Sequence, residues 1–418
     1  MLTFFRYILV LILWPVYGAI AQQIGQTLPA WQQGQLDIHH INTGRGNATF
    51  AILPDGTTVL IDAGSINPID WRTNQPRSLP IKPTDERQAG EWIARYIRKV
   101  LSFQSDPVLD YAIISHFHDD HMGSPLHLTK KSKEGCVLTG ITEVADYLPI
   151  RTVLDRGWPV YTYPQPFDND SMVVNYRRFL VDQTQSKGLK VERFRAGRTD
   201  QITLVKQPNL YRKSFQIRNL AVNGEIWAGD NQPCRKLFPE LATLSTNHYP
   251  NENMCSIALQ IHYGDFDYFS GGDIPGVLQF GEPGWHDVET PLAQVVGPVD
   301  VQLLDHHGYK DSQNGALLAS LRPRIFVVPA WASSHPDRSV LERIYSEQIY
   351  TGNRDVFVTN LLHETRSAIG DLASRLKSTS GHVVVRVEPG GKVYWVLILN
   401  DEDERQQVKA IHGPYQAK

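Results

Sequence analysis

Six residues near position 118 constrain this chain more than any other feature. The segment 116–121 reads His-Phe-His-Asp-Asp-His, the pattern H-x-H-x-D-H. Imidazole nitrogens and carboxylate oxygens are the ligands with which proteins hold zinc, manganese or iron. The segment directly follows an apolar, strand-like run at 109–114, so its side chains would stand on a loop at the end of a buried strand. This pattern predicts a metal site that faces a cleft.

Two further predicted strands also end in residues that can bind metals. Gly271-Gly272-Asp273 follows one strand-like run, and Asp305-His306-His307-Gly308 follows another. A carboxylate that bridges two cations, together with a further imidazole, would complete a binuclear site, in which the ions lie roughly 3.5–4 Å apart. Asp62 ends a third strand-like run and is a candidate to orient a ligand histidine from behind. The strand ends therefore predict a centre for two divalent ions.

Composition and length are those of an ordinary globular protein. The chain has 418 residues, a formal net charge of −3 and 41% hydrophobic residues. This length suits two or three domains or one large α/β domain. The near-zero charge gives no sign of a surface that binds nucleic acid, although it leaves a local basic groove open. Arg45, Arg156 and Lys310 are candidate phosphate contacts, with ordinary surface charge as the alternative for each.

The N-terminal segment predicts export. A short stretch with one positive charge precedes an apolar run at 7–17, and Ala19-Ile20-Ala21 follows. This order is typical of a signal peptide at 1–21 with cleavage before Gln22. The apolar run is shorter than the ~20 residues of a membrane span, so we expect a periplasmic or extracellular protein without a transmembrane domain. An uncleaved N-terminal anchor is the alternative.

The periodicity of the remaining chain indicates one large domain at 36–400. Short antiparallel strands lie at 36–62, an amphipathic helix capped by Thr84 at 84–101, and a last hairpin at 382–399. An N-terminal extension at 22–35 precedes the domain, and a polar, disordered tail at 401–418 follows it. Residues 135–250 lack clear periodicity, which favours a variable insertion that either folds over the cleft or forms a surface excursion.

The three cysteines leave one choice open. In an exported protein, Cys136 and Cys234 could form a disulfide or stay free. Cys255 opens a strand-like run and is expected to be a small buried residue.

In their order along the chain, the motifs resemble the metallo-β-lactamase superfamily, and most closely the ComEC-type competence-protein hydrolase domain and its free-standing secreted relatives. The resemblance spans about residues 36–399, and the middle of this range matches poorly. It rests on Gly-x-Gly at 44–46, Asp-x-Gly at 62–64, H-x-H-x-D-H at 116–121, Asn-x-x-Ser at 253–256, Gly-Asp at 272–273, His-His-Gly at 306–308 and His-Pro at 335–336. It implies an α/β fold, the αββα sandwich, in which two mixed β-sheets pack face to face with helices outside.

The resemblance also implies how the ligands divide. His116 and His118 would bind the ion at the first metal position. Asp120, His121 and His306 would bind the ion at the second. Asp273 would bridge the two. His307 would then touch the substrate or donate a proton, with packing behind the site as the alternative.

The chain departs from many superfamily members at one ligand. Those members have a further histidine before the strand that leads to Asp273, and here Asn253 aligns with that place. His248 lies five residues upstream and could turn into the site instead. His335, in the late His-Pro, is expected to lie behind the ligands or near the substrate. A first position that is poor in ligands would depend on Asp273 and on substrate oxygens.

The chemistry that these residues predict is hydrolysis. A divalent ion lowers the pKa of bound water toward ~7 and so supplies a metal-bound hydroxide at neutral pH, while Asp120 could steer the water proton. We expect two divalent ions, zinc by default and manganese as the alternative. The resemblance favours a phosphodiesterase that is nuclease-like or phosphorylcholine-esterase-like, on a small or polymeric substrate, without a stable nucleic-acid complex.

Two other functions stay open. One is hydrolysis of a carboxylic ester, lactone or β-lactam on the same scaffold. The other is a non-catalytic binding protein that keeps the fold. The sequence does not name the substrate or the oligomeric state.

Overall fold

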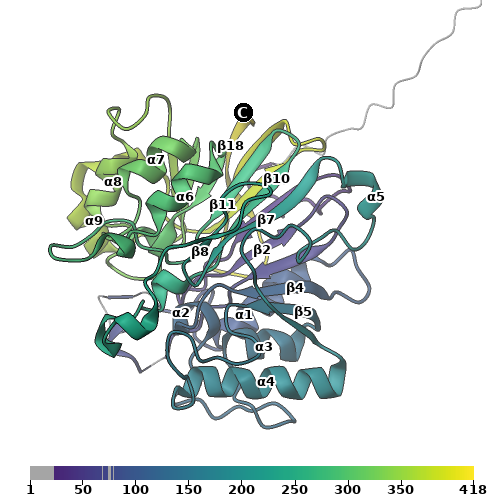
Figure 1. Ribbon diagram of the computed structural model, residues 1–418. Helices are drawn as coiled ribbons and strands as arrows, with labels where there is room; N and C mark the ends of the chain where they lie inside the picture. The colour runs from purple at the N-terminus through teal and green to yellow at the C-terminus, as the bar shows by residue number, and fades with distance from the viewer. Residues whose placement is uncertain (1–22, 68, 74–76, 79) are drawn as a thin grey trace, which may run out of the picture.

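Two nine-stranded β-sheets form the centre of the computed structural model (Figure 1). The structure describes residues 23–67, 69–73, 77–78 and 80–418, so the expected signal peptide at 1–21 lies outside the described residues. Each sheet is mixed: antiparallel hairpins occupy one part and parallel strands the other. Both the α/β class and the αββα sandwich that the sequence predicted are confirmed.

The first sheet contains, in spatial order, β18 (Val408–Gln416), β17 (Val393–Leu399), β16 (His382–Val387), β1 (Leu36–His40), β2 (Thr49–Ile52), β3 (Thr58–Ile61), β4 (Leu109–Ile114), β5 (Ile150–Asp155) and β6 (Lys190–Arg193). The second contains β15 (Leu376–Ser378), β14 (Asp355–Val358), β13 (Ile325–Val328), β12 (Val301–Leu303), β11 (Phe266–Ser270), β10 (Ala258–Tyr263), β7 (Phe215–Val222), β8 (Glu225–Ile226) and β9 (Arg235–Lys236). The helices are α1 (Ala89–Val100), α2 (Asp119–Met122), α3 (Gly140–Tyr147), α4 (Ser171–Lys187), α5 (Pro208–Tyr211), α6 (Glu289–Val296), α7 (Gly315–Leu321), α8 (Arg338–Ile344) and α9 (His363–Ile369).

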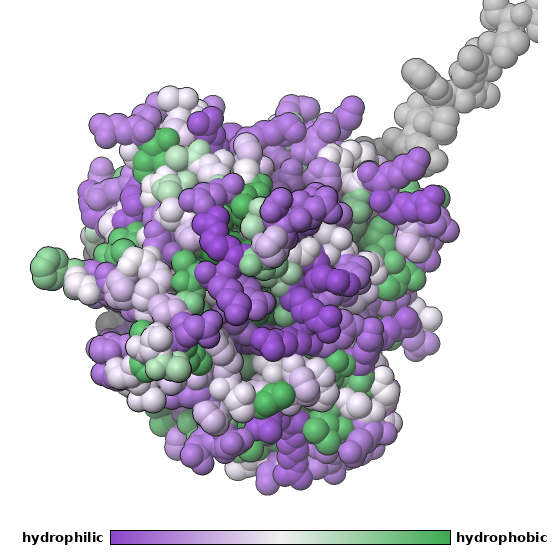
Figure 2. All heavy atoms as spheres, viewed as in Figure 1, coloured by the Kyte–Doolittle hydropathy of each residue, from purple (hydrophilic) through white to green (hydrophobic). Residues whose placement is uncertain are grey.

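The core divides into layers because side chains alternate between the two faces of a strand. Phe50 and Ile52 pack with α1, α3 and α4 outside the first sheet, whereas Ala51 and Leu53 join the layer between the sheets. Outside the second sheet, α6 to α9 cover the other face. On the face drawn in Figure 2, hydrophilic residues predominate and apolar residues are scattered. Within the described part of the chain, no helix is long and apolar enough to cross a membrane.

Parallel strands bring the predicted ligands to one edge of the sandwich. In the first sheet β3 and β4 run parallel, so Asp62 and His116 follow neighbouring strand ends. In the second sheet β11 and β12 run parallel, which places Asp273 beside His306. Ile257 N–H donates to the carbonyl oxygen of Ser115 at 2.9 Å and joins the two sheets there. The ligand loops therefore converge from both layers.

Three boundaries differ from the sequence prediction. The helix expected from Thr84 begins at Ala89. The segment 135–250 is no excursion, because it supplies β5 and β6 to the first sheet and β7 to β9 to the second. Its strands near the sheet edges carry charged residues, as edge strands commonly do, and this obscured their periodicity. The tail at 401–418 contains the edge strand β18, paired with β17.

The structure shows whether the three cysteines form a disulfide. Cys136, Cys234 and Cys255 are all free, with Cys136 and Cys255 buried. The expectation of a buried Cys255 is therefore confirmed, and the open alternative of a 136–234 disulfide is not realised.

Candidate metal centre

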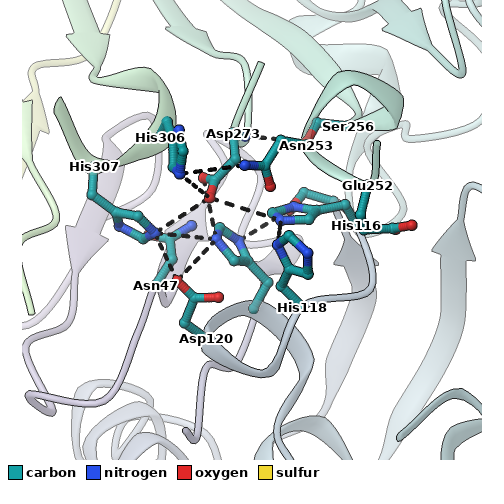
Figure 3. A network of polar contacts seen from close by, with 12 residues as sticks. Asn47, His116, His118, Asp120, Glu252, Asn253, Ser256, Asp273, His306 and His307 are labelled. Carbon is teal, nitrogen blue, oxygen red and sulfur yellow. Dashed lines mark hydrogen bonds and ion pairs between the residues drawn. The ribbon is translucent and has the colours of Figure 1, made fainter. Parts of the chain in front are cut away.

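Four buried side chains meet at the predicted second metal position. Asp120, His121, Asp273 and His307 offer ligand atoms that all lie within 4.8 Å of one another (Figure 3). His307 Nε2 lies 3.1 Å from Asp120 Oδ2 and 3.2 Å from His121 Nε2. His121 Nε2 lies 3.2 Å from Asp273 Oδ1. Tetrahedral zinc with bonds of ~2.0–2.1 Å separates its ligand atoms by about 3.3 Å, so the spacing suits one cation.

The predicted first position lies on the other side of Asp273. His116 Nε2 and His118 Nδ1 are 3.1 Å apart, and His116 Nε2 lies 3.8 Å from Asp273 Oδ2. Asp273 also reaches His121, so its carboxylate lies between both groups, where the resemblance would have a bridging ligand. Ser256 Oγ accepts a hydrogen bond from the backbone N–H of Asp273 at 3.1 Å and fixes this turn, which explains the Asn-x-x-Ser motif.

Hydrogen bonds behind the histidines fix their orientation. Asp62 Oδ2 lies 2.7 Å from His121 Nδ1, and the carbonyl oxygen of Pro329 lies 2.9 Å from His307 Nδ1. Partners of this kind select the tautomer in which Nε2 is free for a metal. Asp62 therefore lies behind His121, one of the histidines that the sequence predicts as ligands.

Close backbone packing explains two glycine motifs. A Cβ atom on Gly46 or Gly64 would lie 2.2 Å or 2.1 Å from the carbonyl oxygen of Asp120. The same oxygen accepts a hydrogen bond from Asn47 N–H at 2.7 Å. Only a residue without a side chain fits against Asp120 at these two places. The Gly-x-Gly and Asp-x-Gly turns thus hold the loop that carries Asp120.

The charges of the cluster stabilise one another. Burial raises the pKa of the Asp120 and Asp273 carboxyls, but the facing imidazoles, His121 first, hold both pKa values well below the usual range. Burial lowers the pKa of His121, but the carboxylates of Asp273, Asp62 and Asp120 together raise it to a value well above the ordinary one. A divalent ion would replace the protons on these imidazoles, so acid would compete with metal binding.

The two histidines of the His-His-Gly turn occupy unexpected places. The sequence assigned His306 to the second position, but the ring of His307 lies there instead. His306 Nε2 lies 3.9 Å from Asp273 Oδ2 and 3.3 Å from Asn253 Nδ2. Both histidines have left-handed backbone, with φ of 46° and 54°. This turn aims both rings toward Asp273, which spacing along the chain could not reveal.

The remaining predicted residues divide between the site and the surface. Asn253 lies beside His306, and His335 is buried with its ring stacked on that of His307, the centroids 4.8 Å apart. His248 is exposed and its Nδ1 lies 2.8 Å from Ser245 Oγ, so it does not turn into the site. A short 3-10 helix, Thr246–His248, holds it on the surface.

The sequence did not indicate two supporting residues, Glu252 and Trp331. Glu252 Oε1 accepts hydrogen bonds from Phe117 N–H and from Arg156 Nε, each at 2.7 Å. Trp331 Nε1 donates to Asp120 Oδ2 at 3.1 Å. Arg156, a candidate phosphate contact by sequence, is therefore buried in an ion pair under the H-x-H loop. No local pattern marks Glu252 or Trp331, because their partners are far away in the sequence.

The donor set fits a pair of divalent ions. Imidazoles and carboxylates, with no cysteine among the residues that meet Asp273, are ligands for zinc, manganese or iron. Asn253 Oδ1 is buried and has no hydrogen-bond partner among the residues that the structure describes. A bound ion or its water would satisfy this oxygen. Two carboxylates that face several imidazoles require either protons or metal ions between them.

Comparisons with known proteins do not assign this chain to a family. No family model matches the chain, and no curated protein matches it. A mutant of the CmlA β-hydroxylase is similar with 13% identity and a TM-score of 0.38, over 77% of this chain and 52% of that chain. The chain thus spans about half the length of that protein.

Two other solved structures are similarly distant. A Parabacteroides distasonis protein assigned as a metal-dependent hydrolase has 11% identity and a TM-score of 0.35, over 79% of this chain and 96% of that chain. The short form of human tRNase Z has 11% identity and a TM-score of 0.28, over 69% of this chain and 91% of that chain. At these TM-scores the similarities assign no function, which must come from the geometry of the site.

Proposed function

We propose that this chain is a metal-dependent hydrolase of the metallo-β-lactamase superfamily, of the ComEC-like branch, and that it hydrolyses phosphodiesters. The observation that carries the proposal is the convergence of Asp120, His121, Asp273 and His307 on one point, with His116 and His118 beyond Asp273. Such a donor set suits two divalent ions, with zinc as the first choice and manganese as the second.

The roles of the side chains follow from their contacts. When bound, the ions would lower the pKa of water toward ~7 and neutralise charge on phosphoryl oxygens. Asp120 Oδ2 accepts from Trp331 Nε1 and faces His307 Nε2, which holds this carboxylate beside the site where a water would lose its proton. His335 stacks on His307 and restrains its ring. The protein thus supplies fixed ligands and one oriented carboxylate.

The surroundings of the site support a small substrate rather than a nucleic acid. An open pocket of about 420 Å³ adjoins His118, and its charged side chains are Asp70, Arg72, Asp119 and Asp170. Arg72 is paired with Asp70 at 2.9 Å and with Asp119 at 2.7 Å. Channels for nucleic-acid strands need cations that follow the phosphate backbone. A pocket with more carboxylates than guanidinium groups favours a phosphodiester whose remaining part is neutral or cationic.

The proposal includes export to the periplasm or the extracellular medium. Its support is the sequence of residues 1–21 alone, with its apolar run and the small residues Ala19 and Ala21. Detection of Gln22 as the N-terminus of the protein recovered from its native host would support this location.

Hydrolysis of bis(p-nitrophenyl) phosphate by the purified full chain tests the function. Metal-free protein should be inactive and should regain turnover with zinc or manganese. His118→Ala and Asp120→Ala should lose at least 100-fold in kcat/KM, whereas the exposed control His248→Ala should keep wild-type activity. Turnover on p-nitrophenyl acetate or a lactone, without any on the phosphodiester, would replace the proposal with ester hydrolysis. Bound metal without turnover on any of these substrates would favour a binding protein.

A further inference from the structure

We infer that the tandem histidines serve different metal positions, His307 the second and His306 the first. His306 would then supply the imidazole that the first position lacks at Asn253. The inference rests on the proposed binuclear centre and moves His306 from the second position, where the resemblance placed it, to the first.

The backbone of the turn supports this assignment. His306 has φ 46° and ψ 42°, and His307 has φ 54° and ψ 16°. Left-handed backbone is strained for a non-glycine residue, and such outliers gather at functional sites. Here the consequence is that two adjacent side chains both approach Asp273 Oδ2, with Nε2 atoms at 3.9 Å and 3.6 Å. The turn thus brings both rings to one carboxylate oxygen.

The ring of His306 is also prepared as a ligand. Asp311 Oδ1 lies 2.7 Å from His306 Nδ1, the same separation as between Asp62 and His121 Nδ1. A carboxylate behind an imidazole fixes its tautomer and makes the other nitrogen a better donor to a metal. The other nitrogen, Nε2, points at Asp273 and lies 3.3 Å from Asn253 Nδ2 (Figure 3).

The place that His306 reaches is the one with too few ligands. Asp273 Oδ2 faces both positions, because His116 Nε2 lies 3.8 Å from it, His306 Nε2 3.9 Å and His307 Nε2 3.6 Å, so the contact with Asn253 distinguishes His306. Asn253 stands beside His306, and its buried Oδ1 has no hydrogen-bond partner within the described ranges. His248, the other candidate, is exposed and held by Ser245. His306 is thus the imidazole that the described geometry offers to the first position.

A salt bridge between His306 and Asp311 with no ligand role is the competing explanation. It accounts for the contact at Nδ1. It does not account for the direction of Nε2 toward Asp273. The two explanations differ in one measurable quantity, the number of metal ions that survive removal of the ring.

Metal stoichiometry tests the inference without reference to turnover. Metal-free full-length protein is titrated with Zn²⁺ in a calorimeter, and bound zinc is counted by mass spectrometry after desalting. Wild type should retain two ions. His306→Ala and His307→Ala should each retain one, and the exposed control His363→Ala should retain two. His306→Gln, which keeps a polar side chain, should show the same loss. Agreement between the two variants would show that the loss does not come from misfolding of the alanine variant.

Double variants identify the position. His118→Ala/His306→Ala should still retain one ion, because both residues serve the first position. His306→Ala/His307→Ala should retain none. Asp311→Asn should lower the affinity for one of the two ions by about 10–100-fold, as the loss of such a partner typically does.

Two results would overturn the assignment. One is two ions of unchanged affinity in both His306→Ala and His306→Gln. The other is loss of both ions in His118→Ala/His306→Ala, which would place His306 in the second position. Two ions in wild type without phosphodiester turnover would instead contradict the proposed function and leave the ligand assignment standing. A wild type that retains no zinc would contradict both.

Discussion

The carboxylate of Asp62 lies 2.7 Å from Nδ1 of His121, although 59 positions separate the two residues. Asp62 also accepts hydrogen bonds from Ser115 N–H at 2.7 Å and from Asn47 Nδ2 at 3.1 Å. One fully buried side chain therefore joins the Gly-x-Gly turn, the end of β4 and a ligand of the proposed metal centre. Its own backbone is left-handed, with φ 62°.

Asp62→Asn should weaken metal binding by about 10–100-fold, because the neutral amide no longer polarises His121. Competition with a chromogenic zinc chelator measures the change. Asp55→Asn is the matched control, since Asp55 is also buried in the first sheet's hairpin but bonds Thr57 and Lys206 far from the ligands. Equal affinities in the two variants would argue against an orienting role for Asp62.

Gly64→Ala should disturb the second metal position. Its Cβ would lie 2.1 Å from the carbonyl oxygen of Asp120, so the ligand loop must shift. We expect a loss of about 1–3 kcal/mol in the free energy of unfolding, which is typical of overpacking, and one zinc ion fewer per chain. Urea unfolding and metal analysis measure these effects. Gly284→Ala, where a Cβ meets nothing within 4 Å, should change neither.

Removal of one partner of the Arg156–Glu252 pair should strongly destabilise the fold. The Arg156 side chain is 1% exposed and that of Glu252 is 12% exposed, and loss of one partner of a buried ion pair costs about 3–5 kcal/mol. Arg156→Met and Glu252→Gln should each show this loss in urea unfolding, whereas the double variant should lose less than the sum. Strict additivity would show that the pair does not act as a unit.

Stability should fall in mild acid because two buried histidines are neutral in the folded chain. Burial lowers the pKa of His40 to about 3 and that of His382 to about 4, below the ~6.5 of an unfolded chain. Between pH ~6.5 and ~4 the unfolded state binds more protons, so the free energy of unfolding decreases as the pH falls. For His382 the loss is on the order of 3 kcal/mol near pH 4.

Urea unfolding of metal-free protein at several pH values checks this dependence. His382→Asn keeps an acceptor for the N–H of Asn42, which bonds His382 Nδ1 at 3.0 Å, and should flatten the dependence between pH 6.5 and 4. The exposed control His248→Asn should leave it unchanged. A slope in His382→Asn equal to that of wild type would show that other groups dominate.

The sequence by itself determined the parts that depend on neighbouring residues. The spacing of His116, His118, Asp120 and His121 places four polar side chains on one turn after β4, and this is readable because a turn is a local structure. Alternating apolar residues likewise predicted the sheets, since the period of a strand is fixed by its backbone. Asp273 could be expected at a strand end for the same reason.

Tertiary structure decided what depends on packing between distant segments. It brought the ring of His307 into the cluster with Asp120 and His121 through a left-handed turn, and it left His248 on the surface. It also assembled β5 to β9 from a stretch without clear periodicity and buried Arg156 against Glu252. Adjacent residues specify local backbone shape, but the direction of a ring and the partner of a charge depend on which surfaces the whole chain brings together.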